Sequence, residues 1–336
     1  MYDFIIIGAG MGGLTVGSLL AQVGKKVCLV EALKKPGGCA HSFKKGDFSF
    51  CASVHYLHIE GKENYLDELL KKLNLENEIL LERLDPSACD VFSCPSQKLR
   101  FTLPNKTEKF YPKKHFRHFV QSMAHRIEHT AGCCVSYKTQ ISKVHISRGK
   151  IHSISTTDGR EFSGKNFIVN MDAQKFSKMM GPHHFPKSFQ EKLQYHYSTS
   201  AYSVYLGMEG INLSDYGFGK NLVWHSPHFD VRKVFHRGQK ECDLKNPWFL
   251  MSTPSLYSAS EDDSMCPKGA CILQIVTTCR YELFANALRQ GEDSYSHLKN
   301  LVLNSILDVV ETFYIPNLRK HLKQITAGTP TTHARQ

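Results

Sequence analysis

The sequence predicts an α/β fold, in which a parallel sheet is joined to a second region of mixed helices and strands. An apolar, β-branched run at residues 2–7 is typical of a strand buried on both faces. A glycine-rich turn follows at once, and a segment of helical composition at residues 14–23 leads to another apolar run at residues 26–30. Strand, turn, helix and strand in this order indicate the βαβ unit of a parallel sheet.

The length and composition fit two globular domains, and the charge pattern limits the kinds of binding partner. The 336 residues are 41% hydrophobic and 22% charged, which excludes disorder on a large scale. The formal net charge is +11, but the lysines are scattered in short groups and no nucleic-acid-binding motif is present, so we expect no nucleic acid partner. A basic exterior leaves open an anionic membrane surface or an acidic partner, beside a face that is simply solvated.

The first turn has the spacing G-x-G-x-x-G, formed by Gly8, Gly10 and Gly13. A dinucleotide site needs such glycines for a tight turn, for close approach of the backbone to a pyrophosphate, and for contact between helix and strand. Glu31 ends the second strand, where a carboxylate can accept both ribose hydroxyls and would disfavour a 2′-phosphate. We therefore predict a dinucleotide site; glycines that serve only a turn are the alternative.

Further glycines bear on the choice between FAD and NAD. Gly17 and Gly24 extend the pattern, and Pro36, Gly37 and Gly38 follow soon after the acidic residue. This longer pattern resembles the dinucleotide motif of FAD-dependent oxidoreductases of the glutathione-reductase and amine-oxidase type, whose second glycine pair also approaches the pyrophosphate. The resemblance favours FAD over NAD.

The remaining elements follow in order along the chain. Residues 39–61 predict a strand pair around a turn at residues 45–47, and residues 64–75 carry leucines at helical spacing. We expect strands on either side of Pro95-Ser96, a helix at residues 115–129, and hairpins turned by Arg148-Gly149 and Asp158-Gly159. A buried strand at residues 167–170, strands at 201–208 and 270–277, and a helix at 294–313 that stops before Pro316 complete the prediction.

Several segments carry a more specific resemblance. GGCAHSF, FSFCASVHYL, VNMDAQKF, YSVYLGME, CPKGACILQIVTT and GTPTTHAR are similar to the carotenoid isomerase and retinol saturase branch of the phytoene desaturase-related flavoproteins. The resemblance runs over nearly the whole chain. It implies a Rossmann-like FAD-binding domain of the glutathione-reductase type (residues 1–58 and 130–185), an interposed mixed α+β substrate domain (59–129 and 186–325), and the start of a C-terminal FAD-binding segment (326–336).

The same resemblance assigns roles to individual residues. It implies that the backbone of Ile141, in a segment similar to a T-x-V-x-x-I strand, contacts adenine; an ordinary sheet residue is the alternative. It also implies that the carboxylate of Glu31 binds the ribose, and that Gly37 and Gly38 approach the pyrophosphate as a second glycine pair. The turn that holds the pyrophosphate would be formed by Gly8, Ala9, Gly10, Met11 and Gly13.

The chain also departs from that family. Relatives carry an acid and a glycine where this chain has Phe50-Cys51-Ala52-Ser53, ahead of His55 and Tyr56. We expect the chain to lack part of the substrate domain between Phe110 and Thr130, and the C-terminal segment that closes over the flavin ring.

The resemblance implies flavin chemistry on an apolar polyene, a carotenoid or retinoid. A flavin takes or gives a hydride or electrons itself, while the protein supplies placement and excludes water, so we assign no catalytic residue. Saturation, desaturation and cis/trans isomerisation all fit, with NAD(P)H as a candidate electron donor. Two alternatives stay open: a flavoprotein acting on another substrate such as an amine, and a shortened form without catalysis.

Other side chains suggest sites less strongly. Histidine pairs at helical spacing could bind a metal, but none has a third ligand at a convincing spacing, so we expect no metal: His55/His58, His115/His118, His125/His129 and His225/His228. His55 is of interest because relatives place its segment near the flavin, although a structural role is favoured. Four tyrosines fit either a polyene channel or strand packing: Tyr195, Tyr197, Tyr202 and Tyr205.

Cysteines and hydropathy bear on the cellular location. The eleven cysteines contain no C-x-x-C pair and suit buried thiols in a reducing compartment, and adjacent Cys133 and Cys134 suit packing better than redox chemistry. We predict no signal peptide and no transmembrane helix, because the first apolar stretch is rich in glycine and no later run is long enough. The expected location is the cytoplasmic side, with peripheral membrane contact and the oligomeric state left open.

Overall fold

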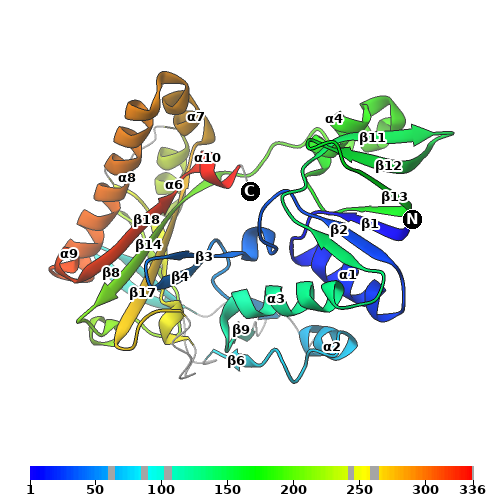
Figure 1. Ribbon diagram of the computed structural model, residues 1–336. Coiled ribbons are helices and arrows are strands. Elements are labelled where there is room, and N and C mark those ends of the chain that lie inside the picture. Colours follow the sequence, from blue (N-terminus) through cyan, green and yellow to red (C-terminus); the bar gives the residue numbers. More distant parts are fainter. Residues whose placement is uncertain (60–64, 85–89, 102–107, 241–245, 258–264, 335–336) are drawn as a thin grey trace. The chain divides into compact units, whose positions relative to one another are not determined.

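The computed structural model describes residues 1–59, 65–84, 90–101, 108–240, 246–257 and 265–334 (Figure 1). The chain divides into two compact units, each assembled from separated stretches. The first unit comprises Met1–Ser42, Tyr65–Leu80 and His115–Tyr197, and the second comprises Phe43–Asn64, Leu81–Lys114 and Ser198–Gln336. The assignment of FAD and substrate domains to particular residues stays a prediction.

The first unit is built on a six-stranded sheet with the order β10-β2-β1-β13-β12-β11. Its first four strands are parallel, and β13, β12 and β11 pair antiparallel as the predicted hairpins. The strands are β1 (Tyr2–Ile7), β2 (Val27–Val30), β10 (Cys134–Ser136), β11 (Ile141–Ser147), β12 (Lys150–Thr156) and β13 (Glu161–Val169). The helices are α1 (Met11–Gln22), α2 (Tyr65–Lys72), α3 (His115–Glu128), α4 (Ala173–Met180) and α5 (Lys187–Lys192).

The βαβ unit predicted at the N-terminus is confirmed. Ile5, Ile6 and Ile7 are buried at the centre of the sheet, between β2 and β13. Gly17 lets α1 lie close to its neighbours, since a Cβ there would stand 2.8 Å from Ile127 Cδ1 of α3. The Ser18 hydroxyl donates to the carbonyl of Met123, 3.0 Å away, and joins the same two helices.

A strand covers residues 167–169 as predicted, but the prediction that it is buried was wrong. These residues form the end of β13, which starts at Glu161 as the partner of β12 and continues beside β1. Phe167, Ile168 and Val169 are only partly buried. One long strand therefore serves both the hairpin and the parallel sheet.

The second unit is built on a seven-stranded sheet with the order β18-β14-β17-β16-β15-β7-β8. Its strands pair antiparallel except β15 and β7. These strands are β7 (Asp90–Cys94), β8 (Gln97–Phe101), β14 (Ser200–Glu209), β15 (Val223–His225), β16 (Phe249–Ser252), β17 (Ala270–Cys279) and β18 (Leu322–Gly328). Two smaller sheets contain β3 (Ser42–Lys45) with β4 (Phe48–Cys51), and β5 (Leu57–Ile59), β9 (Glu108–Pro112) and β6 (Leu81–Arg83).

Helices of the second unit cover one face of its large sheet. Val204, Leu206 and Ile275 of this face pack with Ile306 and Val310 of α8 in one buried cluster. The helices are α6 (Val231–Lys240), α7 (Tyr281–Gln290), α8 (Glu292–Phe313), α9 (Leu318–His321) and α10 (Pro330–His333). The predicted strands at 201–208 and 270–277 and the helix at 294–313 are confirmed. In the described residues, no helix has the length and hydropathy needed to cross a membrane.

Candidate dinucleotide-binding site

Close backbone packing at the turn between β1 and α1 leaves no room for side chains at two of its glycines. Gly8 has a φ of +103°, and a Cβ there would lie 2.5 Å from the carbonyl oxygen of Asn170. A Cβ at Gly13 would lie 2.1 Å from the carbonyl oxygen of Gly8. Both distances are far below van der Waals contact, so the close approach of α1 to the end of β1 depends on these glycines.

Helix α1 begins without a side-chain cap. Gly10 is its N-cap residue, with a φ of −70° and no side-chain hydrogen bond to the first turn. A Cβ at Gly10 would meet only the amide nitrogen of the Asn170 side chain, at 3.2 Å. The first-turn N–H groups of such a helix, together with its dipole, favour an anion.

The second glycine pair packs directly on the first turn. The N–H of Gly37 donates to the carbonyl of Ala9 at 2.7 Å, and Gly10 and Gly37 form a parallel β-bridge. Gly38 has a φ of +54°, and a Cβ there would lie 3.1 Å from the Cα of Gly10. The structure thus brings both glycine segments of the predicted site together, although 23 or more residues separate them along the chain.

Glu31 fastens this turn to the end of β2. Its Oε2 accepts from the N–H of Ala9 at 2.7 Å and its Oε1 from the N–H of Leu33 at 2.8 Å, and the residue is only 8% exposed. A carboxylate oxygen has two lone pairs, so each oxygen can accept one further hydrogen bond. The acid predicted for ribose therefore already has a structural role and keeps acceptor capacity for a sugar hydroxyl.

The segment predicted to meet adenine lies beside Glu31. The N–H of Thr139 donates to the carbonyl of Glu31 at 2.7 Å, while the N–H of Glu31 donates to the carbonyl of Ser136 at 2.9 Å. Ile141 starts β11, is buried, and pairs with Thr156. This geometry fits the predicted position, and the contact of Ile141 with adenine stays a prediction.

Asn170, which we had not assigned from the sequence, stands under the turn. Its N–H donates to the carbonyl of Ile7 at 2.8 Å, and its Nδ2 donates to the carbonyl of Gly8 at 3.2 Å. Its side-chain Oδ1 would lie 2.8 Å from a Cβ at Gly12. The available signal was the segment VNMDA at the end of a strand, but the parallel pairing of β13 with β1 was needed to place it.

Arg160 is a second residue that the sequence did not reveal. Its guanidinium donates to Thr139 Oγ1 at 2.8 Å and to Ser136 Oγ at 2.9 Å, and forms an ion pair with Asp158 at 2.6 Å. The hydrogen bonds from Arg160 hold the pKa of Asp158 well below its ordinary value. Arg160 therefore orients the segment between β10 and β11, whose backbone is hydrogen-bonded to Glu31.

The segment that departs from the family rests on one face of the large sheet in the second unit. Tyr205, Gln274 and Ser252 form a row across β14, β17 and β16, because the register pairs Gln274 with both other residues. The Tyr205 hydroxyl donates to the carbonyl of Ala52, and Gln274 Nε2 donates to the carbonyl of Cys51 at 3.3 Å. Ser252 Oγ lies 2.8 Å from His55 Nδ1. Three polar side chains thus hold residues 51–55.

Two of the singled-out histidines are held neutral by their surroundings. Burial lowers the pKa of His55 to about 4 and that of His225 to about 4. His225 stacks on Phe249 with ring centroids 4.6 Å apart, and its Nδ1 lies 2.8 Å from the Tyr314 hydroxyl. His225 is therefore a core residue with a hydrogen-bond partner, and His55 has the structural contact described above.

The four tyrosines do not line one channel. Tyr202 is fully buried in the cluster under α7 and α8, and its hydroxyl donates to the carbonyl of Lys299 at 2.7 Å. Tyr205 points to the opposite face of β14, because the two residues are three positions apart on one strand. Tyr195 and Tyr197 belong to the first unit and are 45% and 59% exposed.

The adjacent cysteines are packed at the edge of the first sheet. Cys133 Sγ accepts from the N–H of Val27 and donates to the carbonyl of Lys25, at 3.3 and 3.2 Å. Cys134 lies opposite Cys28 in the β10–β2 register, and a hydrogen bond with Cys28 lowers the pKa of Cys134 to about 6.

Parts of the chain are similar to a dinucleotide-binding family and to enzymes named for retinol and prolycopene. The family model described as "NAD(P)-binding Rossmann-like domain" matches residues 6–73. The all-trans-retinol 13,14-reductase of Danio rerio is 46% identical over 55 residues, which are 16% of this chain and 9% of that protein. The chloroplastic prolycopene isomerase of Daucus carota is 26% identical over 207 residues, 61% of this chain and 31% of that protein. The matches thus span less than a third of these curated relatives.

A solved structure matches the whole fold. An oxidoreductase from Methanosarcina mazei superimposes with a TM-score of 0.69 at 13% identity, covering 96% of this chain and 87% of that one. The comparisons confirm the α/β fold with a Rossmann-like domain and the resemblance to the carotenoid isomerase and retinol saturase branch. The matched relatives are named as a reductase and an isomerase, and the family model supports a dinucleotide cofactor.

Proposed function

We propose that this protein binds FAD and acts as an oxidoreductase or isomerase on a polyene lipid of the retinoid or carotenoid class. The glycine turn, its uncapped helix and the carboxylate of Glu31, joined in one hydrogen-bonded unit, carry the proposal for the cofactor. The relatives that act on retinol and prolycopene, by their names, support the proposal for the substrate.

The residues of the first unit fit such a cofactor. The backbone of Gly8, Ala9, Gly10, Met11 and Gly13 would hold the pyrophosphate, with Gly37 and Gly38 as the second approach. Glu31 would hold the ribose through its remaining lone pairs, and the backbone of Ile141 would face the adenine. When bound, a flavin supplies hydride or electron transfer, so the protein needs only to bind, orient and shield the reactants.

The cofactor is tested by the flavin content of the purified full chain. A flavin absorption spectrum with about one FAD per chain, released by denaturation and separated by chromatography, is the expected result. Gly10→Ala should abolish that content while the protein stays folded, because its Cβ would meet only one side-chain nitrogen, at 3.2 Å, but would occupy the space beside the pyrophosphate. A colourless wild-type protein that does not take up added FAD would overturn the proposal.

The substrate is tested separately. The FAD-loaded protein is incubated with all-trans-retinol or with a poly-cis carotene, in the presence and absence of NAD(P)H, and the products are separated by chromatography. A product that depends on the wild-type glycine turn supports a polyene substrate. Turnover of an amine with no change in either polyene would favour the alternative flavoprotein reading, and FAD binding without any turnover would favour the non-catalytic one.

A further inference from the structure

Two cysteines that are far apart in the sequence lie side by side in the first unit. Cys134 of β10 is the direct partner of Cys28 of β2 in a parallel register. Their thiols are hydrogen-bonded to each other, and Cys134 packs against the buried cluster that contains Cys28. Paired strands lie about 4.7–4.9 Å apart, within the Cα separation of roughly 4.4–6.8 Å found in disulfides. The sheet therefore holds the two residues at a separation at which an S–S bond can form.

The two thiols of this pair differ in exposure and in charge. Cys28 is fully buried, whereas Cys134 is partly exposed on β10, the edge strand of the sheet. The Tyr2 hydroxyl lies 3.3 Å from Cys134 Sγ. Hydrogen bonds from Cys28 and Tyr2 lower the pKa of Cys134 to about 6, and the hydrogen bond with Cys134 raises the pKa of Cys28. The accessible sulfur thus has the thiolate character of a reactive cysteine, and the buried thiol stands next to it.

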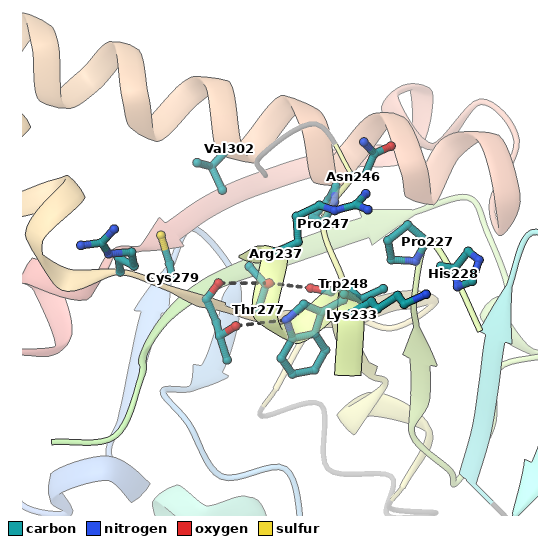
Figure 2. Close-up of a pocket in the computed structure, with 13 residues that line it drawn as sticks. Pro227, His228, Lys233, Arg237, Asn246, Pro247, Trp248, Thr277, Cys279 and Val302 are labelled. Atoms are coloured by element: carbon teal, nitrogen blue, oxygen red, sulfur yellow. Dashed lines mark hydrogen bonds between the residues drawn. The ribbon is translucent and has the colours of Figure 1, made fainter. Parts of the chain in front are cut away.

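Two other cysteines have different surroundings and serve as controls. Cys133 Sγ is engaged with the backbone of Val27 and Lys25, as described above. Cys279 of β17 is 4% exposed and lines a cavity in the second unit (Figure 2). Among the lining residues of that cavity that the structure describes, no other is a cysteine. Cys133 is thus held by backbone groups, and Cys279 meets no second cysteine in the cavity.

We infer that Cys28 and Cys134 form a site of reversible oxidation, at which a hydroperoxide converts the two thiols into a disulfide. The thiolate of Cys134 attacks the peroxide: an S–O bond forms, the O–O bond breaks, the sulfur becomes a sulfenic acid, and the leaving oxygen takes up a proton. The thiol of Cys28 then attacks this sulfur: the S–S bond forms, the S–O bond breaks, and the oxygen leaves as water with the proton of Cys28. A dithiol reductant restores both thiols by exchange.

The disulfide joins two strands that lead into the candidate cofactor site. Ser136 follows Cys134 by two residues on β10, and its carbonyl accepts from the N–H of Glu31 at 2.9 Å. Glu31 itself follows Cys28 by three residues. Oxidation would therefore fix β10 to β2 beside the carboxylate proposed to hold the ribose. The inference itself uses only the paired cysteines and does not depend on the proposed cofactor or substrate.

Peptide mapping provides the measurement. The purified full chain is reduced, freed of reductant, treated with hydrogen peroxide, denatured and alkylated with iodoacetamide, and its tryptic peptides are analysed by mass spectrometry. The expected product is a cross-linked pair of peptides, one with Cys28 and one with Cys134, that is lost after treatment with dithiothreitol. Cys279 should be alkylated to the same extent with and without peroxide, because it is buried away from a second cysteine.

Variants assign the bond, because no lysine or arginine separates Cys133 from Cys134 and trypsin leaves both in one peptide. Cys133→Ser is the matched control and should keep the cross-link, whereas Cys134→Ser should lose it. In Cys28→Ala the sulfenic acid of Cys134 has no thiol to react with, so dimedone should label Cys134 in this variant and not in the wild type. Cys134 is partly exposed, so Cys134→Ser tests the inference even if Cys28→Ala fails to fold.

Three results would overturn the inference. In the first, Cys28 and Cys134 stay fully alkylated after a peroxide treatment that oxidises the exposed Cys39. In the second, the cross-link survives in Cys134→Ser and is lost in Cys133→Ser, so that Cys133 is the partner. In the third, the product is a disulfide between two chains, which appears as a dimer on a non-reducing gel.

Discussion

Replacement of Gly13 by alanine tests the packing that forms the glycine turn. The added Cβ would lie 2.1 Å from the carbonyl oxygen of Gly8, whereas unstrained heavy-atom contacts of this kind lie at roughly 3.5 Å. The oxygen belongs to the backbone at the end of β1 and cannot rotate away. Helix α1 and β1 would therefore have to separate by about 1 Å or more, against the buried contacts that α1 makes with α3.

The size of the effect follows from this clash. Overpacking of this kind costs about 3 kcal/mol, a large part of the stability of a typical domain. For a unit of this size, each kcal/mol lowers Tm by about 2–4 °C, so we expect Gly13→Ala to lower it by about 6–12 °C. The measurement is thermal unfolding followed by circular dichroism, with no cofactor added.

Two other glycines provide matched controls in the same unit. At Gly24 nothing lies within 4 Å of an added Cβ, but φ is +76°, so Gly24→Ala should cost only about 1 kcal/mol of backbone strain. At Gly10 the φ is ordinary and the sole contact is a side-chain nitrogen, so Tm should change by less than about 2 °C. A Tm for Gly13→Ala equal to that of Gly10→Ala would refute the packing argument.

Three further predictions concern buried polar groups. Glu31→Gln places an NH₂ group against the N–H of Ala9 or Leu33, so unfolding in urea should show a loss of about 1–3 kcal/mol, and unchanged stability would contradict this role. Lys109→Met removes the ammonium group that lies 2.5 Å from the fully buried carboxylate of Asp90, so the free energy of unfolding in urea should fall by about 3–5 kcal/mol; Lys109→Met combined with Asp90→Leu should recover much of that loss. Burial lowers the pKa of His225 to about 4 from an ordinary value near 6.5, so the unfolded chain binds the proton first and this residue's contribution to stability should fall by about 3 kcal/mol as pH drops from 6.5 to 4. Because His55 has a similarly lowered pKa, His225→Phe should remove about half of the pH dependence of the urea midpoint that the two histidines cause together, and an unchanged dependence would contradict this.

The sequence predicted those parts of the site that depend on local chemistry. A positive φ at Gly8 and a glycine at the helix start follow from the turn itself, and the period of the apolar residues set β1, α1 and β2. The position of Gly37 and Gly38 against the turn was also predictable, because the longer glycine pattern resembles a known motif.

Residues that meet through long-range pairing were not predictable in the same way. Asn170 reaches the turn because β13 pairs with β1, and nothing near position 170 indicates that partner. The row of Tyr205, Gln274 and Ser252 depends on the register of three strands, which a single sequence does not determine. Short elements such as β15 and β16 were missed, because three or four residues carry too little periodicity.

The parallel pairing of β1 with β13 has a consequence for biosynthesis. Residues 4–7 find their partners only at residues 166–169, so β1 stays without this neighbour until about 160 further residues have been synthesised. At translation speeds of roughly 5–20 residues per second, that delay is on the order of ten seconds or more. During this interval an isoleucine-rich strand is exposed in the nascent chain, a segment that molecular chaperones are suited to shield.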